Sequence, residues 1–296
     1  MTVQILVSLL DEAQEYHRLQ AAVAKAAGTR AGLSVETVFA ENNPVVQIHQ
    51  LFKAIHAPEG ERPAALVVHP VTGEGLERVA RNALKVGLGW IVLNRRVPYV
   101  GALRAERPDL AIASVTPDQG EVGRIHARQM LALAPGGGLV LYVQGPADTS
   151  AAQDRLRAAQ DALTGARFEW KVVNGDWTEA SGERAVAGWL RLKTAEGQRP
   201  ALVVAQSDAM AKGARRAVVS HSADWRRIPV IGCDGLPEGG QKLVTAGELA
   251  ATVLIPASAG PAVDTVARWM QDRKAPPAEV VLAPSPFPAD GPRRPR

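Results

Sequence analysis

Short apolar stretches alternate with amphipathic stretches along nearly the whole chain of 296 residues, and this alternation is the strongest constraint on its fold. The apolar stretches are rich in Val, Ile and Leu and mostly do not alternate with polar residues. That pattern is typical of strands buried on both faces of a parallel sheet. The predicted strands cover residues 3–10, 33–40, 64–70, 90–96, 110–115, 138–145, 168–175, 201–207, 228–235 and 249–256.

The segments between these strands have apolar residues at helical spacing. Regular exchange of strand and helix predicts βαβ units and an α/β fold with doubly wound parallel sheets. In the helix predicted at 14–32, the apolar face carries Leu19, Ala22, Val23 and Ala26. The other predicted helices lie within residues 45–57, 73–87, 120–138, 150–165, 181–197 and 208–222.

About ten strands are too many for one open sheet of ordinary size. A natural division lies near residues 115–120, just before a new series of helices and strands. Two α/β lobes of similar size are therefore expected. Ligands of open parallel sheets bind beyond the carboxyl ends of the strands, so two facing sheets predict an interlobe cleft. Asp234, at the end of the strand predicted at 228–235, is then placed to face a ligand.

Composition and motifs exclude several classes of protein. A hydrophobic content of 46% and a charged content of 22% are typical of a globular protein. The net charge of +4 is scattered, apart from basic residues near the C-terminus, which we interpret as a frayed end. The first strand begins at Val3, which leaves no room for a helix-turn-helix ahead of it, so no direct nucleic-acid partner is expected. The six histidines have no metal-ligand spacing, and no G-x-S-x-G elbow occurs. The single cysteine, Cys233, lies in an apolar run and is interpreted as buried and inert.

No targeting or membrane-spanning segment is visible. The apolar run at 3–10 is too short to cross a bilayer, and it has neither a basic region before it nor a cleavage site after it. The chain as written is therefore expected to be cytoplasmic and not inserted in a membrane. The alternative is a periplasmic protein from which a leader has been removed.

Three segments in the second half of the chain resemble the type I periplasmic sugar-binding proteins of the ribose-binding kind. They are QGPADTSAAQDRLRAAQDAL (144–163), AQSDAMAKGARRAV (205–218) and PVIGCDGLPEGGQKLVTAGELAAT (229–252). The ligand-sensing domains of lac-repressor-type regulators share this fold. The similarity extends from Val3 to about Val281 and is weaker in the first half, where it rests mainly on ILVSLL, WIVLNRR and SVTPDQGEVGR.

The resemblance implies two Rossmann-like lobes joined by three hinge crossings, near Thr116–Pro117, Ile255–Pro256 and Pro284, which close around a sugar or polyol. The N-terminal lobe is expected at 1–116 plus 256–283, and the C-terminal lobe at 117–255 plus 284–296. The resemblance implies no catalysis and no cofactor. The expected partners are the small-molecule ligand and either a transporter permease or a signalling protein.

Four candidate ligand-binding residues follow from the resemblance in the second half. Asp234 matches the family's ligand-binding acid, and its carboxylate can accept from two hydroxyl groups; an Asx-turn or helix cap is the alternative. Arg155 matches an arginine whose fork donates to sugar oxygens; a solvated surface pair is the alternative. Trp177 falls where the family has an aromatic that stacks on the sugar, and packing by its own loop is the alternative. Ser207 replaces the family's asparagine, whereas Asp208 is interpreted as the N-cap of the next helix.

The first half contributes five candidates after two strands. Asn94 and Arg95 stand where the family has Asp-Arg, so a charge is lost and the arginine is kept. Asp11, Glu12 and Tyr16 stand where the family commonly has asparagines and aromatics. For Glu12, attraction to a helix N-terminus is an equally good interpretation. The family's glutamine after the strand at 249–256 is absent, which predicts a more apolar surface there.

A nucleotide-using enzyme is the alternative function. The turn at residues 72–75, after a strand and before a helix, has the topology of a phosphate-binding loop. It lacks the third glycine and an evident ribose-reading acid, so a plain turn is the default interpretation.

Overall fold

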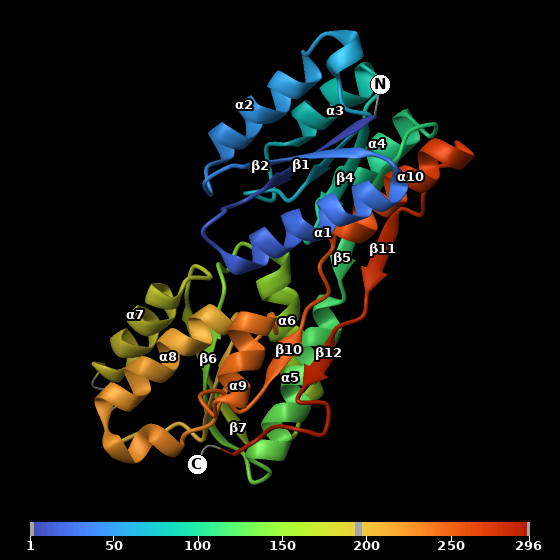
Figure 1. Ribbon diagram of the computed structural model, residues 1–296. Coiled ribbons are helices and arrows are strands. Elements are labelled where there is room, and N and C mark those ends of the chain that lie inside the picture. Colours follow the sequence, from blue (N-terminus) through green and yellow to red (C-terminus); the bar gives the residue numbers. More distant parts are fainter. Residues whose placement is uncertain (1–2, 193–196, 295–296) are drawn as a thin grey trace. The chain divides into compact units, whose positions relative to one another are not determined.

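Parallel strands and their connecting helices form two units in the computed structural model, which describes residues 3–192 and 197–294 (Figure 1). Unit 1 consists of Met1–Pro117 and Pro256–Leu282, and unit 2 of Asp118–Ile255 and Ala283–Arg296. The predicted α/β class with parallel sheets is confirmed. That these units move as two lobes on three hinge crossings stays a prediction.

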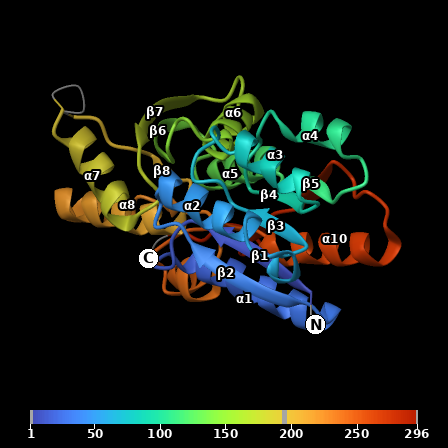
Figure 2. The same ribbon diagram turned by 90° about the horizontal axis from the view of Figure 1, so that it is seen from above.

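In the described part of unit 1, six parallel strands form one sheet in the order β11-β5-β4-β3-β1-β2. Helices α1 and α10 pack together on one face, and α2 and α3 on the other (Figures 1 and 2). The central strands are fully apolar and buried, as in β3 and β4. The elements are β1 (Gln4–Leu9), α1 (Glu15–Ala31), β2 (Ser34–Phe39), α2 (Pro44–Ile55), η1 (Glu59–Glu61), β3 (Ala65–Val68), α3 (Glu77–Lys85), β4 (Gly89–Leu93), α4 (Val100–Glu106), β5 (Ile112–Pro117), α10 (Ala259–Asp272) and β11 (Glu279–Leu282).

In the described part of unit 2, four parallel strands are ordered β7-β6-β8-β9, and β10 pairs antiparallel with β12. Helices α5 and α6 pack together, and so do α7 and α8 (Figure 1). The elements are α5 (Gln119–Leu133), β6 (Gly138–Gln144), α6 (Ser150–Ala162), β7 (Phe168–Asn174), α7 (Glu179–Leu190), β8 (Leu202–Ala205), α8 (Asp208–His221), η3 (Ala223–Arg227), β9 (Val230–Ile231), η4 (Pro237–Gln241), α9 (Lys242–Thr245), β10 (Thr252–Leu254) and β12 (Ser285–Phe287).

The buried face of α1 differs from the predicted one. Ala22 and Ala26 are exposed, whereas Ala21, Ala24 and Gly28 are buried. Small residues are selected on this face because α1 packs closely on its neighbours: a Cβ on Gly28 would lie 2.4 Å from a methyl group of Val35. Apolar spacing alone therefore indicated the helix correctly but not its inward face.

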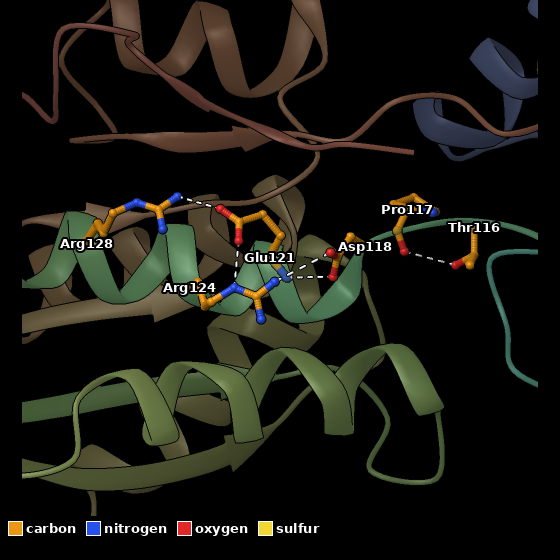
Figure 3. A network of polar contacts seen from close by, with 6 residues as sticks. All are labelled: Thr116, Pro117, Asp118, Glu121, Arg124 and Arg128. Carbon is orange, nitrogen blue, oxygen red and sulfur yellow. Dashed lines mark hydrogen bonds and ion pairs between the residues drawn. The ribbon is translucent and has the colours of Figure 1, made fainter. Parts of the chain in front are cut away.

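A charged network fixes the first turn of α5, directly after β5 (Figure 3). The Asp118 carboxylate caps the helix by accepting from the Glu121 backbone N–H at 2.8 Å. The Glu121 carboxylate accepts from Arg124 at 2.6 Å and from Arg128 at 2.7 Å. Partial burial raises the pKa of Glu121, but the hydrogen bonds from the two arginines outweigh it and the pKa is lowered. The chain thus enters unit 2 through a capped helix start.

Helices α7 and α8 approach so closely that glycine is needed at their contact. A Cβ on Gly213 would lie 2.0 Å from the Glu179 carbonyl oxygen, and one on Gly182 would lie 2.3 Å from the Met210 carbonyl oxygen. Backbone atoms cannot yield as a flexible side chain does, so a methyl group here must push the helices apart.

We expect Gly213→Ala to lower the free energy of unfolding by about 3 kcal/mol because of this overpacking. Gly188→Ala is the matched control, since Gly188 lies in α7 and a Cβ added there would meet nothing within 4 Å. The control should leave stability unchanged or raise it by up to about 1 kcal/mol through helix propensity. Urea unfolding of both variants measures the difference, and equal stabilities would contradict the packing argument.

Candidate functional site

The carboxyl ends of the unit 2 strands bring together the four candidates from the second half of the chain. Parallel strands end at one edge of the sheet, and the segments following β7, β8 and β9 carry Trp177, Ser207 and Asp234. Arg155 reaches the same edge from α6. We call Arg155, Trp177, Gln206, Cys233 and Asp234 the unit 2 strand-end cluster.

Arg155 is the centre of this cluster. Its side chain is buried, with the residue 6% exposed. The Nε donates to Gln119 Oε1 at 2.7 Å, and Nη1 donates to the Gln206 carbonyl oxygen at 2.8 Å. Nη1 also lies 3.5 Å from Cys233 Sγ. A guanidinium keeps its positive charge even when buried, so Arg155 brings a fixed cation to this edge of the sheet. The alternative of a solvated surface pair is wrong for Arg155.

The ring of Trp177 packs on the backbone of the neighbouring strand end. A Cβ on Gly145 would lie 2.1 Å from the Trp177 ring, so only glycine fits at that position. The Arg155 Cζ lies 5.8 Å from the ring centroid, within the range of a cation–π contact. Trp177 itself has a φ of 71°, a conformation that a bulky residue rarely adopts. The ring is therefore held beside the guanidinium, an arrangement that the sequence did not predict.

The assignment of the α8 cap was wrong. Ser207, not Asp208, is the N-cap: its Oγ accepts from the Met210 backbone N–H at 3.1 Å. The Ser207 hydroxyl also lies 3.5 Å from the Trp177 carbonyl oxygen. Both Asp and Ser favour caps, so residue type could not decide between adjacent positions. A ligand contact of Ser207 stays a prediction.

Gln206, before that cap, is a buried residue that sequence reasoning missed. Its Oε1 accepts from the Gly145 N–H at 3.0 Å, and its Nε2 donates to the Tyr142 hydroxyl and to the Ala152 carbonyl oxygen. Its own carbonyl accepts from Arg155. Gln206 thus joins β6, α6 and β8 at the edge where the candidates lie, and it holds the Arg155 guanidinium in place.

Asp234 is half-buried and has a φ of 112°. Its backbone N–H donates to the Val253 carbonyl at 3.0 Å, and its carbonyl accepts from the Ile255 N–H at 3.0 Å. The backbone is therefore held between β9 and the end of β10. The neighbouring Cys233 thiol is fully buried, and burial raises its pKa, which agrees with the interpretation of an inert cysteine.

In unit 1, three of the five candidates meet at the ends of β1 and β4. The Asn94 Nδ2 donates to the Tyr16 hydroxyl at 3.1 Å, and its Oδ1 accepts from the Ser258 hydroxyl at 2.8 Å. Arg95 donates to the Val71 carbonyl at 3.0 Å. Asn94 has a φ of 60°, which asparagine tolerates better than most residues. These contacts orient both side chains from several neighbouring elements.

Two buried histidines complete this edge and were not predicted. The rings of Tyr16 and His17 lie 5.6 Å apart, and those of His17 and His69 lie 5.3 Å apart. Burial lowers the pKa of His17 to about 4, and burial with the nearby His17 and Arg95 lowers the pKa of His69. Both imidazoles are therefore neutral at pH 7. We call Tyr16, His17, His69, Asn94 and Arg95 the unit 1 strand-end cluster.

The remaining two candidates have other contacts. The Asp11 carboxylate accepts from the Ala13 N–H at 2.9 Å and from Asn42 Nδ2 at 3.0 Å, which is an Asx-type turn. Glu12 is exposed, and its backbone carbonyl accepts from Arg18. The Asp11 side chain therefore stabilises its own loop, and the ligand role of both acids stays a prediction.

The side chains of the described residues give little support to a metal site or to a nucleotide-binding site. In the described residues, no three His, Cys, Asp or Glu side chains are grouped so that they could hold a metal ion. At the turn proposed for a nucleotide, the Thr72 hydroxyl donates to the Glu74 carbonyl at 2.7 Å, and α3 begins only at Glu77. None of the described helices is both long enough and apolar enough to span a membrane.

This chain matches a family model and is similar to known proteins. Residues 5–267 match the model of the periplasmic binding protein domain family. The ribose import binding protein RbsB of Escherichia coli strain K12 is 29% identical over 188 residues, which are 64% of this chain. The match spans 58% of the length of that relative.

Two solved structures are also similar. One is the periplasmic binding protein component of the arabinose ABC transporter from Shewanella sp. ANA-3, with a TM-score of 0.84 and 20% identity over 96% of this chain and 91% of that one. The other is the Caulobacter myo-inositol binding protein, with a TM-score of 0.81 and 20% identity over 96% of this chain and 93% of that one. At such identities the likeness establishes the fold alone.

Proposed function

The chain belongs to the periplasmic binding protein domain family, and from that premise we propose that it binds a small sugar or polyol through its strand-end clusters. The observation that carries this proposal is the buried Arg155, which lies beside the Trp177 ring and 3.5 Å from the sulfur of Cys233, the chain neighbour of the half-buried Asp234. A guanidinium donates to sugar oxygens, a carboxylate accepts from hydroxyl groups, and an indole ring covers an apolar C–H face. These three groups together suit a ring with vicinal hydroxyls.

Unit 1 supplies groups of a different kind in this proposal. Neutral imidazoles, the Asn94 amide and the Tyr16 hydroxyl can each donate or accept a hydrogen bond without a net charge. Arg95 is the cation of this cluster. The combination favours an uncharged ligand rich in hydroxyl groups.

The similar proteins support the same class of ligand. The curated relative is named for ribose, and the two structures are named for arabinose and for myo-inositol. We propose that this chain delivers its ligand to the permease of an ABC importer and acts on the periplasmic side. No catalytic step is part of this proposal. The comparisons give the nucleotide-enzyme alternative no support. A signalling partner and closure of the lobes around the ligand stay predictions of the sequence.

Isothermal titration calorimetry tests the proposal. We would titrate the chain with D-ribose, L-arabinose, D-allose, myo-inositol and glycerol, and in a separate arm with ATP and NAD. The expected result is 1:1 binding of at least one sugar or polyol. Asp234→Asn should weaken that binding because the carboxylate is lost. The fold should be kept, since asparagine tolerates a positive φ at this position. A heat of binding with ATP or NAD, and none with any of the sugars or polyols, would overturn the proposal in favour of a nucleotide-using enzyme.

A further inference from the structure

The Asp208 carboxylate joins three segments of unit 2 at the strand-end edge. Asp208 is the first residue of α8 and is 5% exposed. Its Oδ2 accepts from the Gly235 N–H at 2.7 Å, and its Oδ1 accepts from the Thr252 hydroxyl at 2.6 Å. One carboxylate thereby connects the start of α8, the residue after Asp234 and the first residue of β10.

Two glycines allow the surrounding backbone to close on this carboxylate. A Cβ on Gly232 would lie 2.1 Å from Asp208 Oδ1, and a Cβ on Gly240 would lie 2.1 Å from Oδ2. The backbone after β9 and the backbone of η4 therefore both reach the carboxylate directly. Such packing leaves Asp208 little freedom to move.

The peptide that carries Asp234 is in an unfavourable conformation that its neighbours must maintain. Asp234 has a φ of 112° and Gly235 a φ of 62°. A non-glycine residue in such a region costs free energy and persists only where surrounding contacts determine it. The β10 side supplies two backbone hydrogen bonds to Asp234, and Asp208 supplies the bond to the following N–H.

We propose that Asp208 is a positioning residue, which holds the Asp234–Gly235 peptide so that the Asp234 carboxylate is aimed at the ligand. This rests on the proposed function, in which Asp234 accepts from sugar hydroxyl groups. Asp208 acts through Gly235 and does not touch the ligand. Misplacement of a binding group by about 1 Å is enough to lose a large part of its contribution.

Calorimetry on three variants tests this role. Asp208→Ala should raise the Kd for the sugar or polyol bound by the wild type by about 30-fold, because the Gly235 N–H loses its acceptor. Asp208→Asn should restore most of the affinity, since its amide oxygen can accept from Gly235. Thr252→Val is the matched control: it removes the hydrogen bond to Asp208 Oδ1 but keeps the Gly235 bond, so the Kd should stay within about threefold.

A double variant separates positioning from an independent effect. If Asp208 acts through Asp234, Asp208→Ala should weaken binding little further in an Asp234→Asn background. If the loss of affinity in the double variant equals the product of the losses in the two single variants, the proposal is overturned. A folded Asp208→Ala variant with a Kd within threefold of the wild type would overturn it too.

If the Asp208→Ala variant does not fold, the Asp208→Asn variant tests the proposal instead. A neutral oxygen accepts more weakly than a carboxylate, so amide exchange at Gly235 should accelerate and the Kd should rise about fivefold. Faster exchange with an unchanged Kd would contradict the proposal.

If the wild type binds none of the sugars, the proposed function fails, and NMR of the ligand-free chain still tests the positioning. The backbone chemical shifts of Asp234 report its positive φ. Loss of this signature in Asp208→Ala with its retention in Asp208→Asn supports the role of Asp208, and its retention in a folded Asp208→Ala variant overturns it.

Discussion

Replacing Arg155 by alanine should abolish detectable sugar binding, with a loss of affinity of at least about 100-fold, and should lower the free energy of unfolding by about 3 kcal/mol. The guanidinium is buried and donates to the Gln119 side chain and to the Gln206 carbonyl. Alanine leaves these buried acceptors without their donor, which carries a desolvation penalty for each. It also removes the cation beside the Trp177 ring.

Arg157 provides the matched control on the same helix. Its side chain is 67% exposed and pairs with the Asp154 carboxylate, which is partly buried. Because the arginine itself is exposed, Arg157→Ala should change stability by less than about 1 kcal/mol and leave the Kd unchanged. Urea unfolding and calorimetry on both variants give the comparison. An Arg155→Ala protein that binds within threefold of the wild type would remove Arg155 from the site.

Lowering the pH from 7 to 5 should destabilise the protein by about 2 kcal/mol for each of His17 and His126. Burial lowers the pKa of both to about 4; the hydrogen bond to the Gly232 carbonyl partly opposes this for His126. In the unfolded chain these groups titrate near 6.5. Between about pH 6.5 and 4 the unfolded state therefore binds more protons, so stability present above 6.5 is lost as the pH falls. His69, whose pKa is also lowered by burial, adds to the loss.

The free energy of unfolding in urea at pH 7, 6 and 5 measures this dependence. His17→Gln and His126→Gln should each flatten it by about 2 kcal/mol over that range, because glutamine does not titrate. His49→Gln, at an exposed position in α2, is the control for the substitution itself. Identical stability of the wild type at pH 7 and pH 5 would contradict the burial of neutral histidines.

The central strands were predictable because burial on both faces leaves a continuous apolar run. The β3 and β4 residues are all buried, and the sequence of each strand contains no charged or polar side chain. The edge strand β11 was missed: it has four residues, of which alternate ones are exposed. The predicted strand at 228–235 shortens to Val230–Ile231, since the chain turns into positive φ at Asp234. Helices α4 and α10 were also missed.

Side-chain partners explain what the sequence could not predict at the candidate site. The resemblance indicated Arg155, Trp177 and Asp234, and the strand ends of unit 2 hold all three. Gln206 and Asp208, which support these residues, contact residues 27 to 64 positions away in the chain, and no local sequence pattern reveals such contacts. His17 and His69 were set aside because they lack metal-ligand spacing, whereas their signal is burial at the ends of β1 and β3.

Ligand-induced shifts of backbone amides in the ¹⁵N-labelled chain show directly whether the strand-end clusters bind the ligand. With the sugar or polyol that calorimetry identifies, we expect the largest shifts in the two strand-end clusters, at residues such as Asn94, Arg95, Gln206 and Asp234. The Trp177 indole N–H should shift with them. Saturable binding whose largest shifts all lie away from these residues would contradict this expectation.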